Sequence, residues 1–432
     1  MSAELIGILG IILVLLLIAM KFWIGAAMGI VGFLGLVVLR GLNQALTQVG
    51  SIPFQNINSY TMTVIPMFTL MGMVISETDI GKDLFVAAHK WLGHLRGGLA
   101  SASIVASGLL GAICGSHTTG TVIMSKIALP EMTRYKYDLR LSTGSIAAGA
   151  PLSIIIPPSL PMVLYGIMTE QSIGKLFISG IIPGIIMMIV YIIVITVLCR
   201  LNPEMGPADK RASFRERIAS LKGIWAMLAL FLLVLGGIYG GFFTPTESGA
   251  IGAFGAIIIG FIKRELNIKK LLKCIKDTAV LTAMILFIIA GTYVFISFIT
   301  YSKLPFLLSS FIASLNVPTV VILIAIAIMY IILGCFLPEY PMIILTIPII
   351  FPAVTALGVD PIWFGLFTVL MMSMGALSPP VGLVVYILGA CSGVPVATVF
   401  RGTIPFLLAD VFIIILVLLF PQIVTFLPGL MG

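Results

Sequence analysis

The segment Gly149-Ala-Pro-Leu-Ser-Ile-Ile-Ile-Pro-Pro-Ser159 interrupts an apolar stretch that is otherwise long enough to cross a membrane. The segment Gly375-Ala-Leu-Ser-Pro-Pro-Val-Gly382 interrupts a second such stretch. In each segment two consecutive prolines remove two backbone donors and clash with the preceding helical turn. Carbonyl groups are therefore left without partners at membrane depth, where they are tolerated only if they line a cavity or meet a ligand. We expect both segments to be broken membrane helices.

The two Pro-Pro segments belong to an internal repeat, because a shift of 222 residues superposes several punctuating positions at once. The matched residues are Pro130 with Pro352, Asp138 with Asp360, Pro157 and Pro158 with Pro379 and Pro380, Gly180 with Gly402, and Pro183 with Pro405. Chance does not account for so many matches at one register, so two structurally related halves are expected. An odd number of membrane passages between equivalent positions would make the repeat inverted, as in many secondary transporters.

Each half contains a second interruption. Residues 111–121, Gly-Ala-Ile-Cys-Gly-Ser-His-Thr-Thr-Gly-Thr, lie between apolar runs that are too short to cross a membrane separately. We expect a re-entrant hairpin with its tip near residues 115–119. Residues 334–341, Gly-Cys-Phe-Leu-Pro-Glu-Tyr-Pro, are the corresponding hairpin candidate in the second half.

Composition sets the class of protein. The 432 residues are 60% hydrophobic and 9% charged, whereas a soluble domain carries roughly 25% charged residues. This length accommodates on the order of ten to fourteen membrane passages. The apolar stretches are continuous, which favours an all-α multi-pass membrane protein over a barrel. The sequence has no Walker sequence, redox-cofactor motif, catalytic triad or zinc spacing, so neither ATP hydrolysis nor an enzyme is supported.

The net charge of +8 indicates how the chain is oriented in the membrane, rather than binding to nucleic acid. Half of the 24 basic residues fall in two breaks, residues 200–222 and 263–276. The positive-inside rule places both breaks in the cytoplasm. Residues 82–96 mix basic, aromatic and apolar side chains and are typical of a helix that lies in the membrane interface.

These features divide the chain into five parts. The expected parts are N-terminal scaffold helices (1–60), a first repeat (61–199), a cytoplasmic loop (200–222), connecting scaffold helices with a basic loop (223–276), and a second repeat (277–432).

The breaks bring together groups that suit small hard cations and anionic ligands, because free carbonyls, hydroxyls and helix ends are concentrated there. Hydroxyls of Ser116, Thr118 and Thr119 can join the carbonyls of residues 153–158 around one sodium ion. A mirrored cage would use Gly334, Gly375, Ser378 and Val381. The alternative is that Pro and Gly merely kink membrane helices, which four breaks in paired positions disfavour.

Few ionisable residues lie within the apolar runs. Glu339, in the second hairpin candidate, is a functional-site hypothesis because an intramembrane charge is expensive. Glu247 is expected to cap a helix that begins at Ser248. His117 stands at the first hairpin tip near no carboxylate in the sequence, so we expect a polar contact there rather than a proton relay.

An ordered set of motifs resembles the large membrane subunit of tripartite ATP-independent periplasmic (TRAP) transporters over residues 60–425. The motifs include Pro130-Glu131-Met132, Tyr137-Asp138, Ile156-Pro157-Pro158-Ser159, Phe243-Thr244-Pro245-Thr246-Glu247, Gly358-Val359-Asp360-Pro361 and Ser378-Pro379-Pro380-Val381-Gly382. Each motif is weak alone, and their order makes the set specific.

The resemblance implies sodium-driven uptake of an organic acid, such as a dicarboxylate or a sialic acid, across the bacterial inner membrane without ATP. A periplasmic binding protein would deliver the substrate. A transport domain would move like an elevator against a scaffold that includes a small four-helix membrane subunit. The resemblance also implies two sodium sites and a substrate cavity. The residues implied are Ser116, Thr118, Ser153, Ile156 and Pro158 for one sodium ion, Gly334, Gly375, Ser378 and Val381 for the other, and Thr119, Pro157, Ser159, Glu339 and Pro379 for the substrate.

Three positions depart from the family's pattern. Ser153 stands where the family usually has Gly, Ser378 where it has Thr, and Glu339 where it has Asp. Two other functions stay open at this point. One is a self-sufficient sodium and dicarboxylate symporter, and the other is a membrane scaffold subunit that transports nothing.

Overall fold

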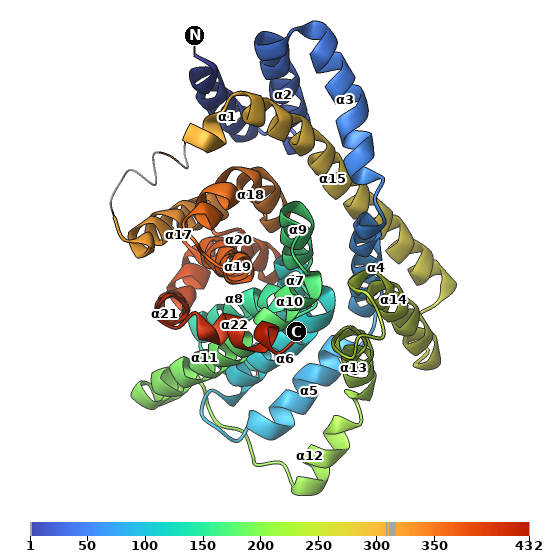
Figure 1. The fold of residues 1–432 in the computed structure, drawn as a ribbon. Coiled ribbons are helices and arrows are strands. Elements are labelled where there is room, and N and C mark those ends of the chain that lie inside the picture. The colour runs from blue at the N-terminus through green and yellow to red at the C-terminus, as the bar shows by residue number, and fades with distance from the viewer. Residues whose placement is uncertain (1, 308–309, 311–316, 432) are drawn as a thin grey trace.

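The computed structural model describes residues 2–307, 310 and 317–431, and every regular element in those residues is a helix. Figure 1 shows an outer arc of helices beside an inner cluster. The arc consists of α1 (Ala3–Ala19), α2 (Ile24–Arg40), α3 (Leu42–Ile57), η1 (Tyr60–Thr63), α4 (Val64–Ser76), α13 (Trp225–Tyr239), α14 (Pro245–Ile262) and α15 (Ile268–Tyr301). Three short elements, α5 (Ile80–Leu92), η2 (Pro203–Met205) and α12 (Phe214–Leu221), connect the two groups at one end.

Helix α15 organises the arc, and its closest neighbour is α2. Glycines on α2 allow the two backbones to approach. A Cβ atom on Gly25 would lie 2.7 Å from the carbonyl oxygen of Phe287, and one on Gly32 would lie 2.8 Å from the Cα atom of Phe295. Small residues at such crossings are typical of helices packed within a membrane.

The inner cluster contains both Pro-Pro segments. Its helices are α6 (Gly98–Cys114), α7 (His117–Arg134), α8 (Leu139–Ile155), α9 (Leu160–Thr169), α10 (Ile173–Ser179), α11 (Ile181–Leu201), α17 (Thr319–Phe336), α18 (Glu339–Ala356), α19 (Pro361–Leu377), α20 (Leu383–Ser392), α21 (Val396–Leu419) and α22 (Gln422–Gly429). Helix α8 is the centre of the cluster, since residues 141–155 are all buried between α6, α7 and α21. Many of them are Ser, Thr, Gly or Ala, which permits three neighbours to pack closely around one helix.

Matched positions of the two halves have matched roles. The carboxylates of Asp138 and Asp360 accept hydrogen bonds from the first turns of α8 and α19. Both Pro-Pro segments separate two helices, α8 from α9 and α19 from α20, and both Pro-Pro bonds are cis. The halves differ at the next pair, because Gly180 separates α10 from α11, whereas Gly402 lies inside the continuous helix α21.

Fewer helices are long and apolar enough to cross a membrane than the length of the chain accommodates. Within the described residues, seven helices are long and apolar enough to cross a membrane, or up to nine if each of two bent pairs forms one span. This range lies below the roughly ten to fourteen passages that the length accommodates. The breaks explain the difference, since they divide apolar sequence into helices such as α9 and α20 that are too short to span by themselves.

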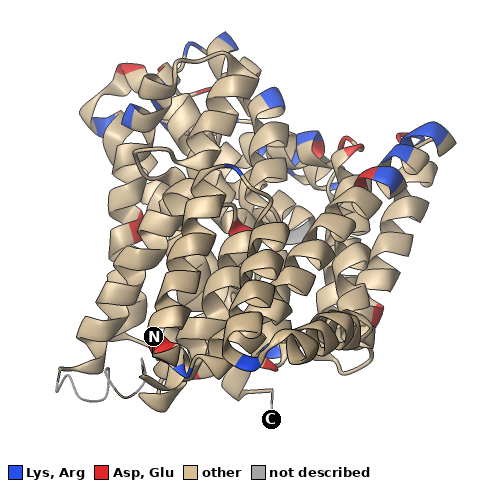
Figure 2. Cartoon of the chain, turned by 90° about the horizontal axis from the view of Figure 1, so that it is seen from above, with Lys and Arg blue, Asp and Glu red and all other residues tan. Residues whose placement is uncertain are grey.

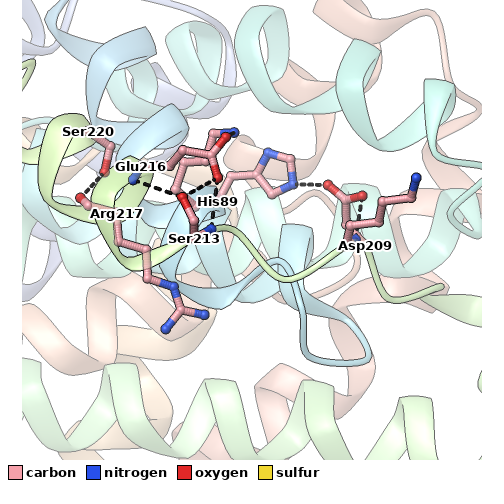
Figure 3. A network of polar contacts seen from close by, with 8 residues as sticks. His89, Asp209, Ser213, Glu216, Arg217 and Ser220 are labelled. Atoms are coloured by element: carbon pink, nitrogen blue, oxygen red, sulfur yellow. Dashed lines mark hydrogen bonds and ion pairs between the residues drawn. The ribbon is translucent and has the colours of Figure 1, made fainter.

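The two basic breaks meet at α5. Lys263 Nζ lies 2.7 Å from Asp83 Oδ2, and His89 Nε2 lies 3.0 Å from Asp209 Oδ2 (Figure 3). Figure 2 shows that most Lys and Arg positions lie toward one end of the molecule. Partial burial alone would raise the pKa of Asp209, but the backbone N–H of Lys210 and the neighbouring His89 hold that pKa below its usual range.

Candidate functional site

The first hairpin turns at two residues. Helix α6 ends at Cys114 and α7 begins at His117. Gly115 has a left-handed backbone conformation, with φ +57°, and a Cβ atom there would lie 3.1 Å from the carbonyl oxygen of Pro158. The left-handed conformation and the short distance both disfavour a side chain at this position. Glycine therefore allows the tip to pack against the first broken helix. The sequence placed the tip near residues 115–119, and the turn lies at the start of that range.

The first broken helix is enclosed. Residues 156–159 are all buried, and no hydrogen bond from the described residues reaches the carbonyl oxygens of Ile156, Pro157 or Pro158. The carbonyl of Ser153 is also without its helical donor, because the residue four positions later is Pro157. This break therefore concentrates carbonyl oxygens that have no hydrogen-bond donor among the described residues.

The Ser153 hydroxyl lies between the two helices of the first hairpin. Its Oγ donates to the carbonyl oxygen of Ser107 at 3.4 Å. It also lies against Gly120, where an added Cβ atom would approach it to 2.8 Å. The structure therefore brings Ser116 and Thr118 together at the tip. The Ser153 hydroxyl is hydrogen-bonded to Ser107, whereas the Ser153 carbonyl lacks its helical donor.

The second hairpin packs closely on the second broken helix, as the first hairpin packs on the first broken helix, but the two breaks have different surroundings. Helix α17 ends at Phe336 and α18 begins at Glu339. Gly334 packs on Gly375, since a Cβ atom on Gly334 would lie 3.1 Å from the Cα atom of Gly375. Ser378 Oγ donates to the carbonyl oxygen of Met374 at 2.8 Å.

The second break is exposed at its prolines. Pro379 and Pro380 are exposed, and Val381 is half-buried. Gly382, with φ +59°, returns the chain to α20, and a Cβ atom there would lie 3.0 Å from the carbonyl oxygen of Ser378. This break is accessible from the surface, whereas the first break is not.

The two hairpin tips meet each other. Glu339 Oε1 lies 3.5 Å from Ser116 Oγ, and Glu339 Oε2 lies 3.9 Å from His117 Nδ1. Both side chains of the His117–Glu339 pair are buried. The expectation that His117 lies near no carboxylate was therefore wrong. The repeat contained the missing signal, because the shift of 222 residues makes His117 and Glu339 equivalent positions of the two tips.

A cavity of about 250 Å³ lies between the tips and the arc. Its lining residues come from α4 (Thr69, Gly72 and Met73), the first tip (Cys114, Ser116, Thr118 and Thr119), α9 (Leu160), α15 (Leu281 and Met284) and the second tip (Pro338, Glu339 and Tyr340). Of the residues expected at a substrate cavity, Thr119 and Glu339 line this space, and Pro157, Ser159 and Pro379 are outside its lining.

Two further observations limit what the polar residues can do. Glu247 forms a capping box with Thr244, whose backbone N–H donates to Glu247 Oε2 at 2.8 Å. The helix begins at Pro245 rather than Ser248, so its N-cap is Thr244, and Glu247 completes the capping box from inside the first turn. Within the part of the chain that the structure describes, no three His, Cys, Asp or Glu residues are grouped so that they could hold a metal ion. An ion held here would depend on hydroxyls, carbonyls and single carboxylates.

Comparison with known proteins identifies the family. Residues 11–423 match the family described as tripartite ATP-independent periplasmic transporter, DctM component. The chain belongs to this family. The DctM-family chain is therefore a multi-pass membrane component of an ATP-independent transporter, and not an enzyme. Membership also disfavours a membrane scaffold that transports nothing.

Individual relatives resemble the DctM-family chain over most of its length. It is 34% identical over 381 residues to the C4-dicarboxylate TRAP transporter large permease protein DctM of Pseudomonas aeruginosa, with 88% of each chain covered. It is 30% identical over 399 residues to the sialic acid TRAP transporter large permease protein SiaM of Vibrio cholerae, with 92% of each chain covered.

A solved structure shares the fold. The crystal structure of the Alcanivorax borkumensis YdaH transporter superposes with a TM-score of 0.60 at 14% identity, and the match covers 88% of this chain and 89% of that one. At this identity the likeness concerns the fold alone.

Proposed function

We propose that this chain is the large permease of a three-component system that takes up an organic acid across the bacterial inner membrane, driven by a sodium gradient. The observation that carries the proposal is the meeting of two hairpin tips at one cavity, where Ser116, Thr118, Thr119 and Glu339 line a space of about 250 Å³. Interrupted helices that converge on a cavity are the sites at which secondary transporters hold substrate and ions.

Two sodium sites are proposed, one at each break. The first uses Ser116, Thr118, Ile156, Pro158 and the backbone of Ser153. Its support is the set of buried carbonyl oxygens that receive no hydrogen bond from the part of the chain that the structure describes. The second uses Gly334, Gly375, Ser378 and Val381. Its support is the equivalent break, where Pro380 removes the helical donor of the Ala376 carbonyl.

An elevator motion is proposed from the arrangement of the two groups of helices. The arc would be the scaffold, and the inner cluster, built from two inverted repeats, would be the transport domain. The cavity supports this division, because α4 and α15 of the arc form one wall and the hairpin tips form the other. A domain that slides against α4 and α15 would carry the tips and their contents with it.

The substrate and the partners are proposed from the relatives. One relative is named for C4-dicarboxylates and another for sialic acid, so a carboxylate is the proposed substrate class. The proposed partners are a periplasmic binding protein that delivers it and a small four-helix membrane subunit that completes the scaffold.

A reconstituted uptake assay tests the proposal. Proteoliposomes containing the chain and its small subunit would be supplied with the binding protein and a panel of labelled dicarboxylates, sialic acids and other carboxylates. Uptake should require an inward sodium gradient and should stop when an ionophore dissipates it. Uptake without the binding protein would favour a self-sufficient symporter, and uptake driven equally by choline would contradict sodium coupling.

A further inference from the structure

A second cavity, of about 380 Å³, lies between the arc and the inner cluster, away from the hairpin tips. Its polar lining comes from both groups of helices, with Gln55, Asn56, Ser59 and Thr61 on the arc and Glu170 and Gln171 on the inner cluster. Among its described lining residues there is one acid and no lysine, arginine or histidine. A ligand that fits this cavity should therefore be positively charged.

The cavity lies at the end of the molecule opposite the basic breaks. The backbone N–H of Asp138, directly before α8, donates to the carbonyl oxygen of Met205 in the first basic break at 3.0 Å. From there α8 and α9 form one candidate span of 31 residues, Leu139–Thr169, which ends beside Glu170. The positive-inside rule that places the basic breaks in the cytoplasm therefore places this cavity toward the periplasm.

Two helices end at the cavity. Gln55 and Asn56 belong to the last turn of α3, which ends at Ile57, and Glu170 directly follows α9, which ends at Thr169. The C-terminal end of a helix carries a partial negative charge, because its last carbonyl groups lack helical donors, and it attracts cations. The two helix ends and the Glu170 carboxylate therefore give the cavity a negative potential.

Glu170 breaks two local rules. It caps the C-terminal end of α9 in the left-handed conformation, with φ +56°, where glycine is usual. An acid at this end of a helix is also electrostatically unfavourable. None of the described residues forms an ion pair with its carboxylate. Such conflicts are typical of functional positions, and a bound cation would remove the electrostatic one.

Two side-chain amides of the cavity have their nitrogen atoms engaged by the backbone. Asn56 Nδ2 donates to the carbonyl oxygen of Ile52 at 2.8 Å, and Gln171 Nε2 donates to the carbonyl oxygen of Thr169 at 3.0 Å. A carbonyl oxygen can only accept, so these bonds assign the amide orientations and leave both amide oxygens as acceptors. With a carboxylate and two hydroxyls, they form a set of oxygen ligands of the kind that calcium takes.

We propose that this cavity binds a calcium ion that bridges the arc and the inner cluster. The ligands are the Glu170 carboxylate and the amide oxygens of Asn56 and Gln171, and hydroxyls and water complete the shell. Calcium is favoured over magnesium because it accepts about six to eight oxygens in a flexible geometry, whereas magnesium requires a near-ideal octahedron. A site with one carboxylate should bind with a Kd of about 10⁻⁴ to 10⁻³ M, as in extracellular calcium modules.

The bridge also affects transport, and this step rests on the proposed function. Asn56 belongs to the arc, whereas Glu170 and Gln171 belong to the inner cluster, so an ion bound to all three favours the present arrangement of the two groups. A movement of the inner cluster along α4 and α15 separates these ligands. Periplasmic calcium should therefore slow uptake severalfold without entering the cavity at the hairpin tips.

Calcium binding to the purified chain with its small subunit tests the site without any transport. Binding would be measured by equilibrium dialysis with radioactive calcium, and by the Tm, at a constant sodium concentration. Calcium chloride at about 10 mM should raise the Tm by about 1–4 °C, because the ion binds the folded chain. Magnesium chloride at the same concentration should raise it less.

Three variants locate the ion. Glu170→Gln keeps the size of the side chain and removes its charge, so the half-saturating calcium concentration should rise at least about tenfold. Gln55→Glu should lower that concentration, because a second carboxylate joins the ligands at the end of α3. Glu131→Gln is the matched control, since Glu131 lies 3.8 Å from Arg134 on α7, outside the cavity. It should bind calcium like the unaltered chain.

The outcomes separate this inference from the proposed function. The site is wrong if the unaltered chain binds no calcium, if magnesium binds equally well, or if Glu170→Gln binds calcium as tightly as the unaltered chain. None of these results affects sodium-driven uptake, which is measured in calcium-free buffer. Calcium that binds at Glu170 and leaves uptake unchanged would instead contradict the proposed sliding motion. The unaltered chain and Gln55→Glu keep the test decisive if Glu170→Gln fails to fold.

Discussion

The two broken helices have the same base and different surroundings. At the base of the first, Ser153 packs on Gly111, and at the base of the second, Gly375 packs on Gly334. The prolines of the first break are buried, whereas Pro379 and Pro380 of the second are exposed. Equivalent sequence therefore sets how the helices cross, and the neighbouring elements set how accessible each break is.

This difference has a consequence for ions. The carbonyl groups of the first break belong to buried residues, while the second break is accessible from the surface. We expect the first site to exchange its ion slowly and the second to exchange it readily. Four predictions test whether the packing at the base of each break is independent of how accessible that break is.

The largest effect is expected from exchanging the residue at the base of the second break. In Gly375→Ser the added Cβ atom would lie 2.6 Å from the carbonyl oxygen of Ile331 and 2.8 Å from the Cα atom of Gly334. Both are backbone atoms that cannot rotate away, so the variant should be destabilised at the upper end of about 1–3 kcal/mol. A thermal melt of the purified protein should show a much lower Tm. An unchanged Tm would contradict the close packing of Gly375 against Ile331 and Gly334.

The second largest effect is expected from removing a proposed sodium ligand at each of the two breaks. Ser116→Ala and Ser378→Ala each remove one oxygen and should each raise the sodium concentration for half-maximal uptake. A lost ligand in a site sheltered from water costs about 1–3 kcal/mol, or roughly five- to hundredfold in affinity. The accessible second site should lose less than the enclosed first site, because water can replace the missing oxygen there. Uptake with unchanged sodium dependence in both variants would contradict both ion sites.

A third prediction addresses accessibility directly. Exposed irregular backbone is not tolerated against lipid, so the second break should face water or a partner. With the exposed Cys391 replaced by Ser, a cysteine at position 380 should react with a polar maleimide in the purified chain, and a cysteine at position 158 should not. Sodium should slow the reaction at position 380. Equal labelling at both positions would contradict the difference in enclosure.

The sequence predicted the breaks and the hairpins because their cause is local. Consecutive prolines cannot continue a helix, and their effect does not depend on distant residues. The meeting of His117 with Glu339 and the exposure of Pro379 depend on how separate helices pack, which hydropathy does not encode. The hydrogen bond of the Ser153 hydroxyl likewise depends on another helix, since Ser107 of α6 accepts it.

The smallest effect is expected from Ser153→Gly, which gives the first break the residue found at the base of the second. The variant loses one hydrogen bond of 3.4 Å to Ser107, and it places a glycine in the last turn of α8. Each change costs about 1 kcal/mol or less, so the Tm should fall only slightly.

The sodium dependence of uptake decides what Ser153 contributes. Its hydroxyl faces Ser107, while its carbonyl lacks a helical donor because Pro157 follows four residues later. Glycine retains that carbonyl, so Ser153→Gly should need the same sodium concentration as the unaltered chain. Ser116→Ala measured alongside should need more. If Ser153→Gly instead raised the sodium requirement as much as Ser116→Ala does, the hydroxyl would be a ligand. The side chain would then have to turn from Ser107 toward the hairpin tip when sodium binds.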